Sequence, residues 1–277
     1  MISVAMTTYN GAAYVEEQLR SILGQTVPVD EIVVCDDGSS DDTCAIIRRL
    51  ADSRVRLWRN PENLGYIENF YQAISRTTGD YIFLADQDDR WAPDKVEKTL
   101  ARMQSGGFAA VCTDFRLIDA EGMPLADKSA YQINPFIRRV KTPEARITTL
   151  RLAFGNIAQG CTYCFTKEVR DVYLRLHNRE VIHDYQIMLI ASCVGKAAFL
   201  KEELIDYRLH GHNSIGFSQK NRRIAIKTKA SREPFMYRFF RQLNELVPVP
   251  HLFFYRALYY LRIPYLVAIV RRKLLAE

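Results

Sequence analysis

Apolar runs of four or five residues recur along roughly the first 115 residues and alternate with longer amphipathic runs. The apolar runs predict buried strands at Ile2–Met6, Glu31–Cys35, Val55–Trp58, Tyr81–Ala85 and Ala109–Thr113. The runs between them carry apolar residues at helical spacing, and Asn10 is the expected N-cap of the first helix. Strands that alternate with helices indicate βαβ units. We therefore expect an α/β fold with a mostly parallel sheet flanked by helices.

The alternation weakens after the fifth predicted strand, where turn residues and a polar stretch at 126–142 indicate loops. Later apolar runs predict strands at Cys161–Thr166, Ala197–Leu200 and Leu204–Tyr207, and a helix at Asp184–Val194. No linker-like composition interrupts this part of the chain. The sequence therefore predicts one domain over residues 1–216 and a helical appendage over residues 217–277.

Length and composition set the broad class. The 277 residues, 48% of them hydrophobic, can bury a full core. The six cysteines lie mostly in apolar runs, which favours reduced, buried thiols over a disulfide framework. Cys161 and Cys164 have the spacing of a metal-binding pair, but no second pair completes four ligands, so packing in a strand is expected. The chain opens on a predicted strand with no signal-like charged start, so we expect a cytoplasmic location.

Charge is distributed unevenly along the chain. Residues 217–277 carry 13 Lys and Arg against three Asp and Glu, whereas the preceding part is slightly acidic. Aromatic residues alternate with arginines in this basic segment, and its longest charge-free apolar stretch, Ile263–Val270, is too short to span a bilayer. We expect it to lie on the anionic inner face of the plasma membrane and to bind no nucleic acid. The alternative is that its helices pack their aromatic faces on the first domain or on a second subunit.

An acidic segment, Asp86-Gln87-Asp88-Asp89, directly follows the predicted strand Tyr81–Ala85. Parallel α/β sheets bind ligands beyond the carboxyl ends of their strands, and Mg²⁺ or Mn²⁺ takes carboxylate and phosphate oxygens there. The segment is therefore a candidate site for a divalent metal. Taken alone, such a run is more often a solvated turn or the cap of the next helix.

Polar residues after the first two predicted strands are candidates for binding a nucleotide base. Neither GxxxxGK[ST] nor GxGxxG occurs in the chain, so a common phosphate loop is absent from the sequence. Thr7, Thr8 and Tyr9, with Asp36 and Asp37, place hydroxyls, an aromatic ring and carboxylates at one edge. A carboxylate can accept the imide N–H of uracil or thymine. The alternative is that the aspartates only cap the following helix.

Five motifs in this order resemble those of the family 2 inverting glycosyltransferases with the GT-A fold. The motifs are Ser3-Val4-Ala5-Met6-Thr7-Thr8-Tyr9-Asn10, Val33-Val34-Cys35-Asp36-Asp37-Gly38-Ser39-Ser40-Asp41, Asn63-Leu64-Gly65, Asp86-Gln87-Asp88-Asp89 and Trp91-Ala92-Pro93-Asp94-Lys95. The resemblance implies a nucleotide-diphosphate-sugar donor, a Mg²⁺ or Mn²⁺ ion and direct transfer with inversion. It assigns the base to Thr7 and Asp37, with Asp36, and the ribose or the metal shell to Asp86, while Thr8 and Tyr9 stay donor candidates from their position at the sheet edge. It assigns the metal to Asp88 and Asp86, with Asp89 as an accessory residue.

Inverting transfer needs a base opposite the leaving diphosphate, and this base must be a carboxylate or a histidine. Members of the family usually place an Asp there, commonly after a Glu and just before a helix. The matching segment is Ile182-His183-Asp184-Tyr185-Gln186, so the resemblance assigns the base to Asp184 and puts His183 where Glu is commoner. An N-cap role for Asp184 is compatible with this assignment.

A last cluster, Tyr207-Arg208-Leu209-His210-Gly211-His212-Asn213-Ser214-Ile215-Gly216, joins an arginine and two histidines in a loop. We expect Arg208 to bind the donor diphosphate and His210 to be a further metal ligand, with His212 as an accessory residue. Surface histidines are, however, often bystanders. The cluster most resembles the bacterial rhamnosyltransferase branch of the family, which implies dTDP-L-rhamnose as the donor.

The sequence thus predicts a metal-dependent inverting glycosyltransferase. We expect it to move one sugar, L-rhamnose by resemblance, onto a lipid-linked oligosaccharide acceptor of a bacterial surface polysaccharide. A homo-oligomer is compatible with the sequence. Two other functions use a similar fold: a nucleotidyltransferase, which would not need a base at Asp184, and a non-catalytic carbohydrate-binding or assembly subunit, which would not need the acidic segment.

Overall fold

The computed structural model describes residues 1–129, 141–211, 234–263 and 267. Its strands are β1 Ile2–Thr8, β2 Glu31–Asp36, β3 Val55–Arg59, β4 Tyr81–Ala85, β5 Arg90–Trp91, β6 Ala110–Ile118, β7 Pro124–Ser129, β8 Glu144–Ile147, β9 Tyr163–Thr166 and β10 Ala197–Arg208. Its helices are α1 Val15–Leu23, α2 Thr43–Arg49, α3 Tyr66–Ser75, α4 Lys95–Gly106, α6 Thr149–Leu152, α7 Lys167–Leu176, α8 His183–Val194, α9 Phe235–Asn244 and α10 Leu252–Tyr260. A short 3-10 helix, η2, spans Gly160–Thr162.

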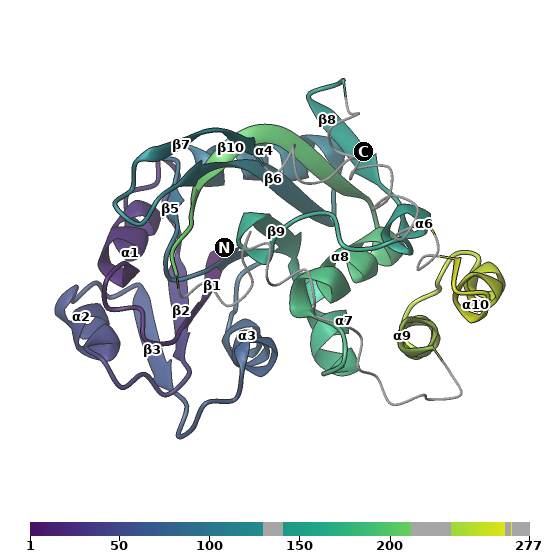
Figure 1. The fold of residues 1–277 in the computed structure, drawn as a ribbon, viewed down its shortest axis with the longest axis horizontal. Helices are drawn as coiled ribbons and strands as arrows, with labels where there is room; N and C mark the ends of the chain where they lie inside the picture. The colour runs from purple at the N-terminus through teal and green to yellow at the C-terminus, as the bar shows by residue number, and fades with distance from the viewer. Residues whose placement is uncertain (130–140, 212–233, 264–266, 268–277) are drawn as a thin grey trace.

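The described strands form one mixed sheet (Figure 1). Its main order is β3-β2-β1-β4-β9-β6-β10-β5, while β7 pairs with β6 and β8 pairs with β10. The pairs among β3, β2, β1 and β4 are parallel, as is the pair of β6 and β10. Because β9 is antiparallel to both β4 and β6, these two strands run in the same direction. The carboxyl ends of β1, β2, β4, β6 and β10 therefore face one edge of the sheet.

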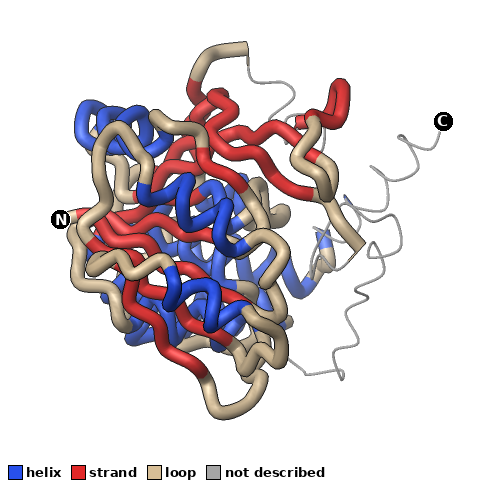
Figure 2. The backbone as a smooth tube through the Cα atoms, turned by 90° about the vertical axis from the view of Figure 1, so that its left-hand side faces the viewer, coloured by secondary structure: helices blue, strands red, loops and turns tan. Residues whose placement is uncertain are grey.

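Helices cover both faces of the sheet (Figure 1 and Figure 2). The apolar stripes of α1, α2 and α4 pack on one face, and those of α3, α7 and α8 pack on the other. Helix α1 shows how the sequence produces this layer: Val15, Leu19 and Ile22 recur at helical spacing and are all fully buried. The prediction of an α/β fold with a mostly parallel sheet is confirmed.

Four local predictions are wrong. The loop predicted at 126–142 overlaps β7, Pro124–Ser129, which pairs with β6. Helix α1 begins at Val15, and Asn10 does not cap it, because Asn10 has a φ of 48° and its Oδ1 accepts a hydrogen bond from the Ser40 amide. Asparagine tolerates this left-handed conformation, which turns the chain away from β1. The two strands predicted at 197–200 and 204–207 are one strand, β10, whose shifts in register with β6 accommodate the polar residues between them. The strand predicted from Cys161 begins at Tyr163, after η2.

Helices α9 and α10 pack on the side of the sheet that α3, α7 and α8 cover. The Phe240 ring stacks on Tyr255 at a centroid distance of 4.6 Å, and the Tyr259 hydroxyl donates to the Ala153 carbonyl at 2.8 Å. These aromatics belong to the same buried cluster as α8, so the packing alternative holds for them. Phe253 remains 82% exposed on α10. The boundary predicted at residue 216 and the basic residues 271–273 lie outside the described residues.

Among the helices that the structure describes, none combines the length and the apolar character needed to cross a lipid bilayer. The buried cysteines agree with the sequence-based expectation: five of the six thiols are buried, and the sixth, Cys193, is half-buried.

Candidate active site

The segments after β1 and β2 form one hydrogen-bonded unit. The Thr8 hydroxyl donates to the Asp36 carboxylate at 2.8 Å, and the Ser39 amide donates to the same carboxylate at 2.9 Å. The Asp37 carboxylate accepts from the backbone amides of Leu64 and Gly65 at 2.8 and 2.9 Å. Both carboxylates are buried and therefore fix the shape of these loops. Their contact with a nucleotide base stays a prediction.

Thr7 and Tyr9 lie beside this unit and are more accessible. Thr7 is half-buried, whereas Tyr9 is 48% exposed. The Tyr9 backbone pairs with the side-chain amide of Gln87, since Tyr9 N donates to Gln87 Oε1 at 2.8 Å and Gln87 Nε2 donates to Tyr9 O at 3.0 Å. A Cβ on Gly11 would lie 2.2 Å from Gln87 Oε1, so only glycine leaves room for this bridge. The end of β1 is thereby tied to the segment that follows β4.

The segment after β4, residues 86–89, is called here the acidic loop. The Asp88 Oδ2 atom lies 2.7 Å from His210 Nε2. Asp89 is 1% exposed, and its Oδ1 accepts from the Arg208 amide at 3.1 Å. Asp86 is half-buried at the start of the loop. The structure thus brings the predicted metal residues Asp88 and His210 into contact, and Asp86 lies close enough to Asp88 for the two carboxylates to interact.

Asp184 lies at the start of α8 and faces the acidic loop. It is the second residue of the helix, because Ile182 and not Asp184 occupies the N-cap position. Asp184 is 6% exposed, and its Oδ1 accepts from the Tyr185 amide at 2.5 Å. A Cβ on Gly160 would lie 3.3 Å from the Asp184 Cβ, so glycine allows η2 to approach closely. The N-cap prediction is wrong, but the carboxylate still sits in the first turn, where the helix dipole favours negative charge.

His183 is an uncharged neighbour of Asp184. Its ring stacks on Phe70 at 4.0 Å between centroids and meets Tyr66 edge-on at 6.3 Å. Burial lowers the pKa of the imidazole to about 3, so His183 is neutral at physiological pH. The residue before the predicted base is therefore an aromatic, neutral side chain.

Burial and mutual repulsion raise the pKa values of the site's carboxyls. Burial raises the pKa of Asp184 to about 7, although hydrogen bonds from Tyr185 N and the Asn156 side chain oppose the rise. For Asp86, burial raises the pKa first, and the carboxylates of Asp88 and Asp184 raise it further. The pKa of Asp89 is also raised, by burial and then by Asp88 and Asp86. Several carboxyls therefore share one poorly solvated space without enough positive charge to offset them.

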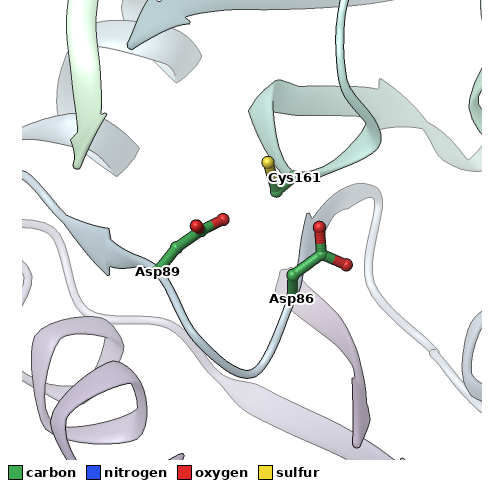
Figure 3. Close-up of side chains that lie close together, drawn as sticks. All are labelled: Asp86, Asp89 and Cys161. Carbon is green, nitrogen blue, oxygen red and sulfur yellow. The ribbon is translucent and has the colours of Figure 1, made fainter. Parts of the chain in front are cut away.

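This electrostatic arrangement fits a divalent cation. Figure 3 shows the carboxylates of Asp86 and Asp89 near the Cys161 thiol, and ligand atoms of the three lie within 4.8 Å of one another. Burial raises the pKa of Cys161, so the sulfur is a neutral thiol and a poor ligand for Mg²⁺ or Mn²⁺. Asp88 and His210, which contact each other beside this group, offer an oxygen and an imidazole ligand. The chemistry of these side chains, several carboxylates with one imidazole beside them, therefore fits a hard divalent cation.

Two other predicted residues need separate mention. Arg208 is 2% exposed, and its guanidinium is directed toward Glu17 and backbone carbonyls of the acidic loop and the β6–β7 turn. Its predicted contact with a donor diphosphate stays a prediction. His212 lies outside the described residues.

Several residues of the site were not predicted from the sequence. Gln87 bridges the acidic loop to β1, and the Asn156 side chain reaches the Asp184 carboxylate. The ring of Tyr14 lies 4.9 Å from that of His210. Gln87 was visible inside the acidic motif, but its partner was not. Asn156 and Tyr14 lie in segments with no motif, so only the folded chain reveals them.

The comparison with known families identifies the class. Residues 3–166 match the sequence model described as Glycosyl transferase family 2. This match covers more than half of the chain, which therefore belongs to that family and is a glycosyltransferase. Inversion at the anomeric carbon is typical of the family.

Relatives and solved structures agree with this assignment. A putative teichuronic acid biosynthesis glycosyltransferase, TuaG of Bacillus subtilis, is 29% identical over 88% of this chain and 90% of its own length. Hyaluronan synthase of Pasteurella multocida is 28% identical over 89% of this chain, which spans 25% of that synthase. The crystal structure of S. aureus TarS residues 1–349 with UDP-GlcNAc superposes with a TM-score of 0.62 at 17% identity, over 88% of this chain and 65% of that one. The last likeness concerns the fold alone.

Proposed function

We propose that this enzyme transfers a sugar from a nucleoside-diphosphate donor to an acceptor hydroxyl, with inversion and with a divalent cation at the acidic loop. The observation that carries the proposal is the pairing of two sites from distant parts of the chain. Asp184, at the start of α8, lies close enough to Asp86, at the end of β4, to raise the pKa of the Asp86 carboxyl. One side suits a leaving diphosphate, and the other suits a proton acceptor.

The proposed reaction is a single displacement. The acceptor oxygen forms a bond to the anomeric carbon while the bond from that carbon to the diphosphate oxygen breaks. The acceptor proton passes to the Asp184 carboxylate, whose pKa of about 7 suits a base near neutral pH. A bound Mg²⁺ or Mn²⁺ would offset the negative charge of the diphosphate. Asp86, Asp88 and His210 would hold that ion. Asp89 would stabilise the loop by accepting a hydrogen bond from the Arg208 amide.

The donor is proposed to carry uracil or thymine. The base would bind beside Thr7 and Tyr9 and against the loops shaped by Asp36 and Asp37. Hydroxyl and amide groups there can form hydrogen bonds with its ring carbonyls and imide. The TarS structures were solved with UDP and with UDP-GlcNAc, and the name of WfgD of Escherichia coli specifies UDP-Glc. These names favour uridine. The motif around His210 predicts a different donor, dTDP-L-rhamnose, and this stays a prediction.

The acceptor is proposed to be a lipid-linked oligosaccharide of a bacterial surface polysaccharide. The names of TuaG and WfgD refer to teichuronic acid biosynthesis and to a diphosphoundecaprenol-linked sugar. Helix α10 would hold the enzyme peripherally on the inner face of the plasma membrane, because its outward side exposes Phe253, Phe254 and Arg256. Aromatic and basic side chains together suit the headgroup region of an anionic bilayer. A homo-oligomer stays a prediction.

Ligand binding and product analysis test the proposal together. The first step is a thermal-shift comparison of UDP-sugars and dTDP-sugars with and without Mn²⁺, because a ligand that binds only the folded state raises its stability. We expect a metal-dependent shift with at least one donor, followed by release of nucleoside diphosphate and a product of inverted anomeric configuration. Release of pyrophosphate with transfer of the nucleoside monophosphate would instead identify a nucleotidyltransferase. Tight binding without turnover on any acceptor glycan would favour a non-catalytic subunit.

A further inference from the structure

Arg208 is the largest side chain that the described fold buries completely. It ends β10, beside the acidic loop, and its guanidinium lies over the Tyr14 ring at 4.8 Å. Its Nη2 forms an ion pair with Glu17 Oε2 at 2.6 Å. A buried guanidinium is strongly unfavourable unless its five N–H donors find acceptors. The position of these acceptors therefore indicates what the side chain does.

The remaining donors of Arg208 reach backbone carbonyls on two sides. Nε donates to the Asp88 carbonyl at 2.8 Å, and Nη1 donates to the Ala120 carbonyl at 3.0 Å in the turn after β6. The Arg208 backbone amide adds a third contact, to Asp89 Oδ1 at 3.1 Å. A Cβ on Gly122 would lie 3.3 Å from Nη1, so the turn leaves just enough room for the guanidinium. One residue thus joins the acidic loop to α1 and to the β6–β7 turn.

The same contacts lie beside the side chains that are proposed to hold the metal ion. Arg208 holds the backbone carbonyl of Asp88 through its Nε atom. The Asp88 side chain points toward His210, with Oδ2 lying 2.7 Å from His210 Nε2. His210 follows Arg208 by two residues, and its ring and the Arg208 guanidinium both lie against Tyr14. We propose that Arg208 is a positioning residue that holds the acidic loop in the geometry required for metal binding. The inference rests on the metal site of the proposed function.

The competing role for Arg208 is direct contact with the donor diphosphate. That role would require the guanidinium to leave Glu17 and the loop carbonyls and to become accessible. The two roles differ in what a conservative substitution removes. A positioning residue affects the acidic loop and the affinity for the metal ion even when no nucleotide is present, whereas a diphosphate contact affects only nucleotide affinity.

The principal test is the affinity for Mn²⁺ alone, measured by electron paramagnetic resonance on the full chain. Arg208→Lys keeps the positive charge but cannot reach Glu17 and both carbonyls at once. We expect its Mn²⁺ affinity to fall by about tenfold, the loss typical of removing a group that orients a metal ligand. Arg116→Lys is the matched control, because Arg116 also ion-pairs on the sheet, with Asp206, but makes none of the described contacts with the acidic loop. It should bind Mn²⁺ as the wild type does.

A second variant and a metal-free measurement protect the test against misfolding. The Glu17 side chain is 43% exposed, so Glu17→Gln should fold even if Arg208→Lys does not, and its Mn²⁺ affinity should fall in the same direction by a smaller factor. Hydrogen–deuterium exchange without metal should be faster in the peptide that contains residues 86–89 in either variant. If Arg208→Lys fails to fold, the Mn²⁺ affinity and loop exchange of Glu17→Gln decide whether Arg208 is a positioning residue.

Two outcomes would overturn the positioning role. One is wild-type Mn²⁺ affinity and loop exchange in Arg208→Lys with weakened binding of UDP, which would assign Arg208 to the diphosphate. The other is no change in any of these measurements. If the wild type itself bound no Mn²⁺, the metal part of the proposed function would fail. Exchange of the metal-free loop would then still decide whether Arg208 positions it.

Discussion

The two sides of the candidate active site differ in the number of charged side chains that they hold. The acidic loop gathers three aspartates, and the Arg208 backbone amide and the His210 ring reach two of them from the end of β10. The start of α8 holds a single carboxylate, Asp184, among neutral groups such as His183. A surplus of negative charge suits the binding of a cation and its diphosphate. A single, poorly solvated carboxylate at the start of a helix suits the acceptance of one proton.

This difference predicts that binding and chemistry can be separated by mutation. Changes in the acidic loop should act on the affinity for metal and donor. Changes at the start of α8 should act on the rate of the chemical step while the donor remains bound. Mutants that altered both properties alike on both sides would contradict this division.

The largest expected effect is that of Asp184→Asn on kcat. The amide of the variant cannot take up the proton of the acceptor hydroxyl. We therefore expect kcat to fall by about 10²–10⁴-fold while donor affinity stays within a factor of about two. Single-turnover kinetics and donor titration measure the two quantities. Asp171→Asn, a change at a carboxylate whose side chain is 52% exposed on α7, is the control and should behave as wild type. Unchanged kcat with a raised acceptor KM would make Asp184 a binding residue.

Asp88→Asn should act mainly on binding. An amide oxygen is a weaker ligand for a hard cation than a carboxylate, so we expect metal-dependent donor affinity to fall by more than about tenfold with the fold intact. Isothermal titration with and without Mn²⁺ measures the loss. Asp80→Asn is the matched control, since Asp80 precedes β4 at the opposite edge of the sheet and its side chain is 66% exposed. Equal metal dependence in Asp88→Asn and wild type would remove Asp88 from the metal site.

A smaller effect is expected from the side-chain amide of Asn156, which lies beside the proposed base Asp184. The Asn156 side chain donates to Asp184 and lowers its pKa, while Asn156 Oδ1 accepts from Ile157 N at 2.9 Å and from the Tyr163 hydroxyl at 3.2 Å. The wild type should lose activity as pH falls through about 7, because Asp184 acts only when deprotonated. In Asn156→Ala the midpoint should move upward by about one pH unit, since a hydrogen bond to the charged form is lost.

The pH profile of kcat from about pH 5 to 9 tests this shift, because it reports the ionisation of the enzyme–substrate complex. Asn244→Ala is the control, since Asn244 makes a comparable bond to the Val249 amide far from the site. An unchanged midpoint in Asn156→Ala with a lower kcat at every pH would mean that Asn156 serves packing alone.

How much of this site the sequence could predict depends on the range of the contacts. The convergence of Asp88 and His210 was predictable in outline, because both follow strands and the carboxyl ends of parallel strands meet at one edge. The pairing of Arg208 with Glu17 was not, because it joins residues 191 positions apart through tertiary packing. The position of Asn156 has no periodic or motif signal. Sequence pattern therefore predicts which loops meet, and packing determines which side chains they bring together.

The C-terminal helices show the same limit. Aromatic residues with interspersed arginines suit both a buried helix face and a membrane surface, and the pattern alone does not divide them. In the structure Phe239 and Phe240 are fully buried, whereas Phe253 and Phe254 are 82% and 49% exposed. The packing prediction is therefore confirmed for the buried face, whereas contact with a membrane stays a prediction that concerns the exposed face.

The smallest effect on catalysis, and the last prediction, concerns this exposed face. Phe253→Ser combined with Phe254→Ser removes exposed aromatic area without touching the buried Tyr255. We expect flotation with anionic liposomes at low salt to fall severalfold, because the rings suit the headgroup boundary, whereas kcat on a water-soluble acceptor should stay within a factor of about two. Met123→Ser is the control, since Met123 is an exposed apolar residue, 63% accessible, in the turn between β6 and β7. Equal flotation of the double variant and the wild type would exclude this face as the membrane contact, and binding of neutral and anionic vesicles alike would exclude the basic residues beside it.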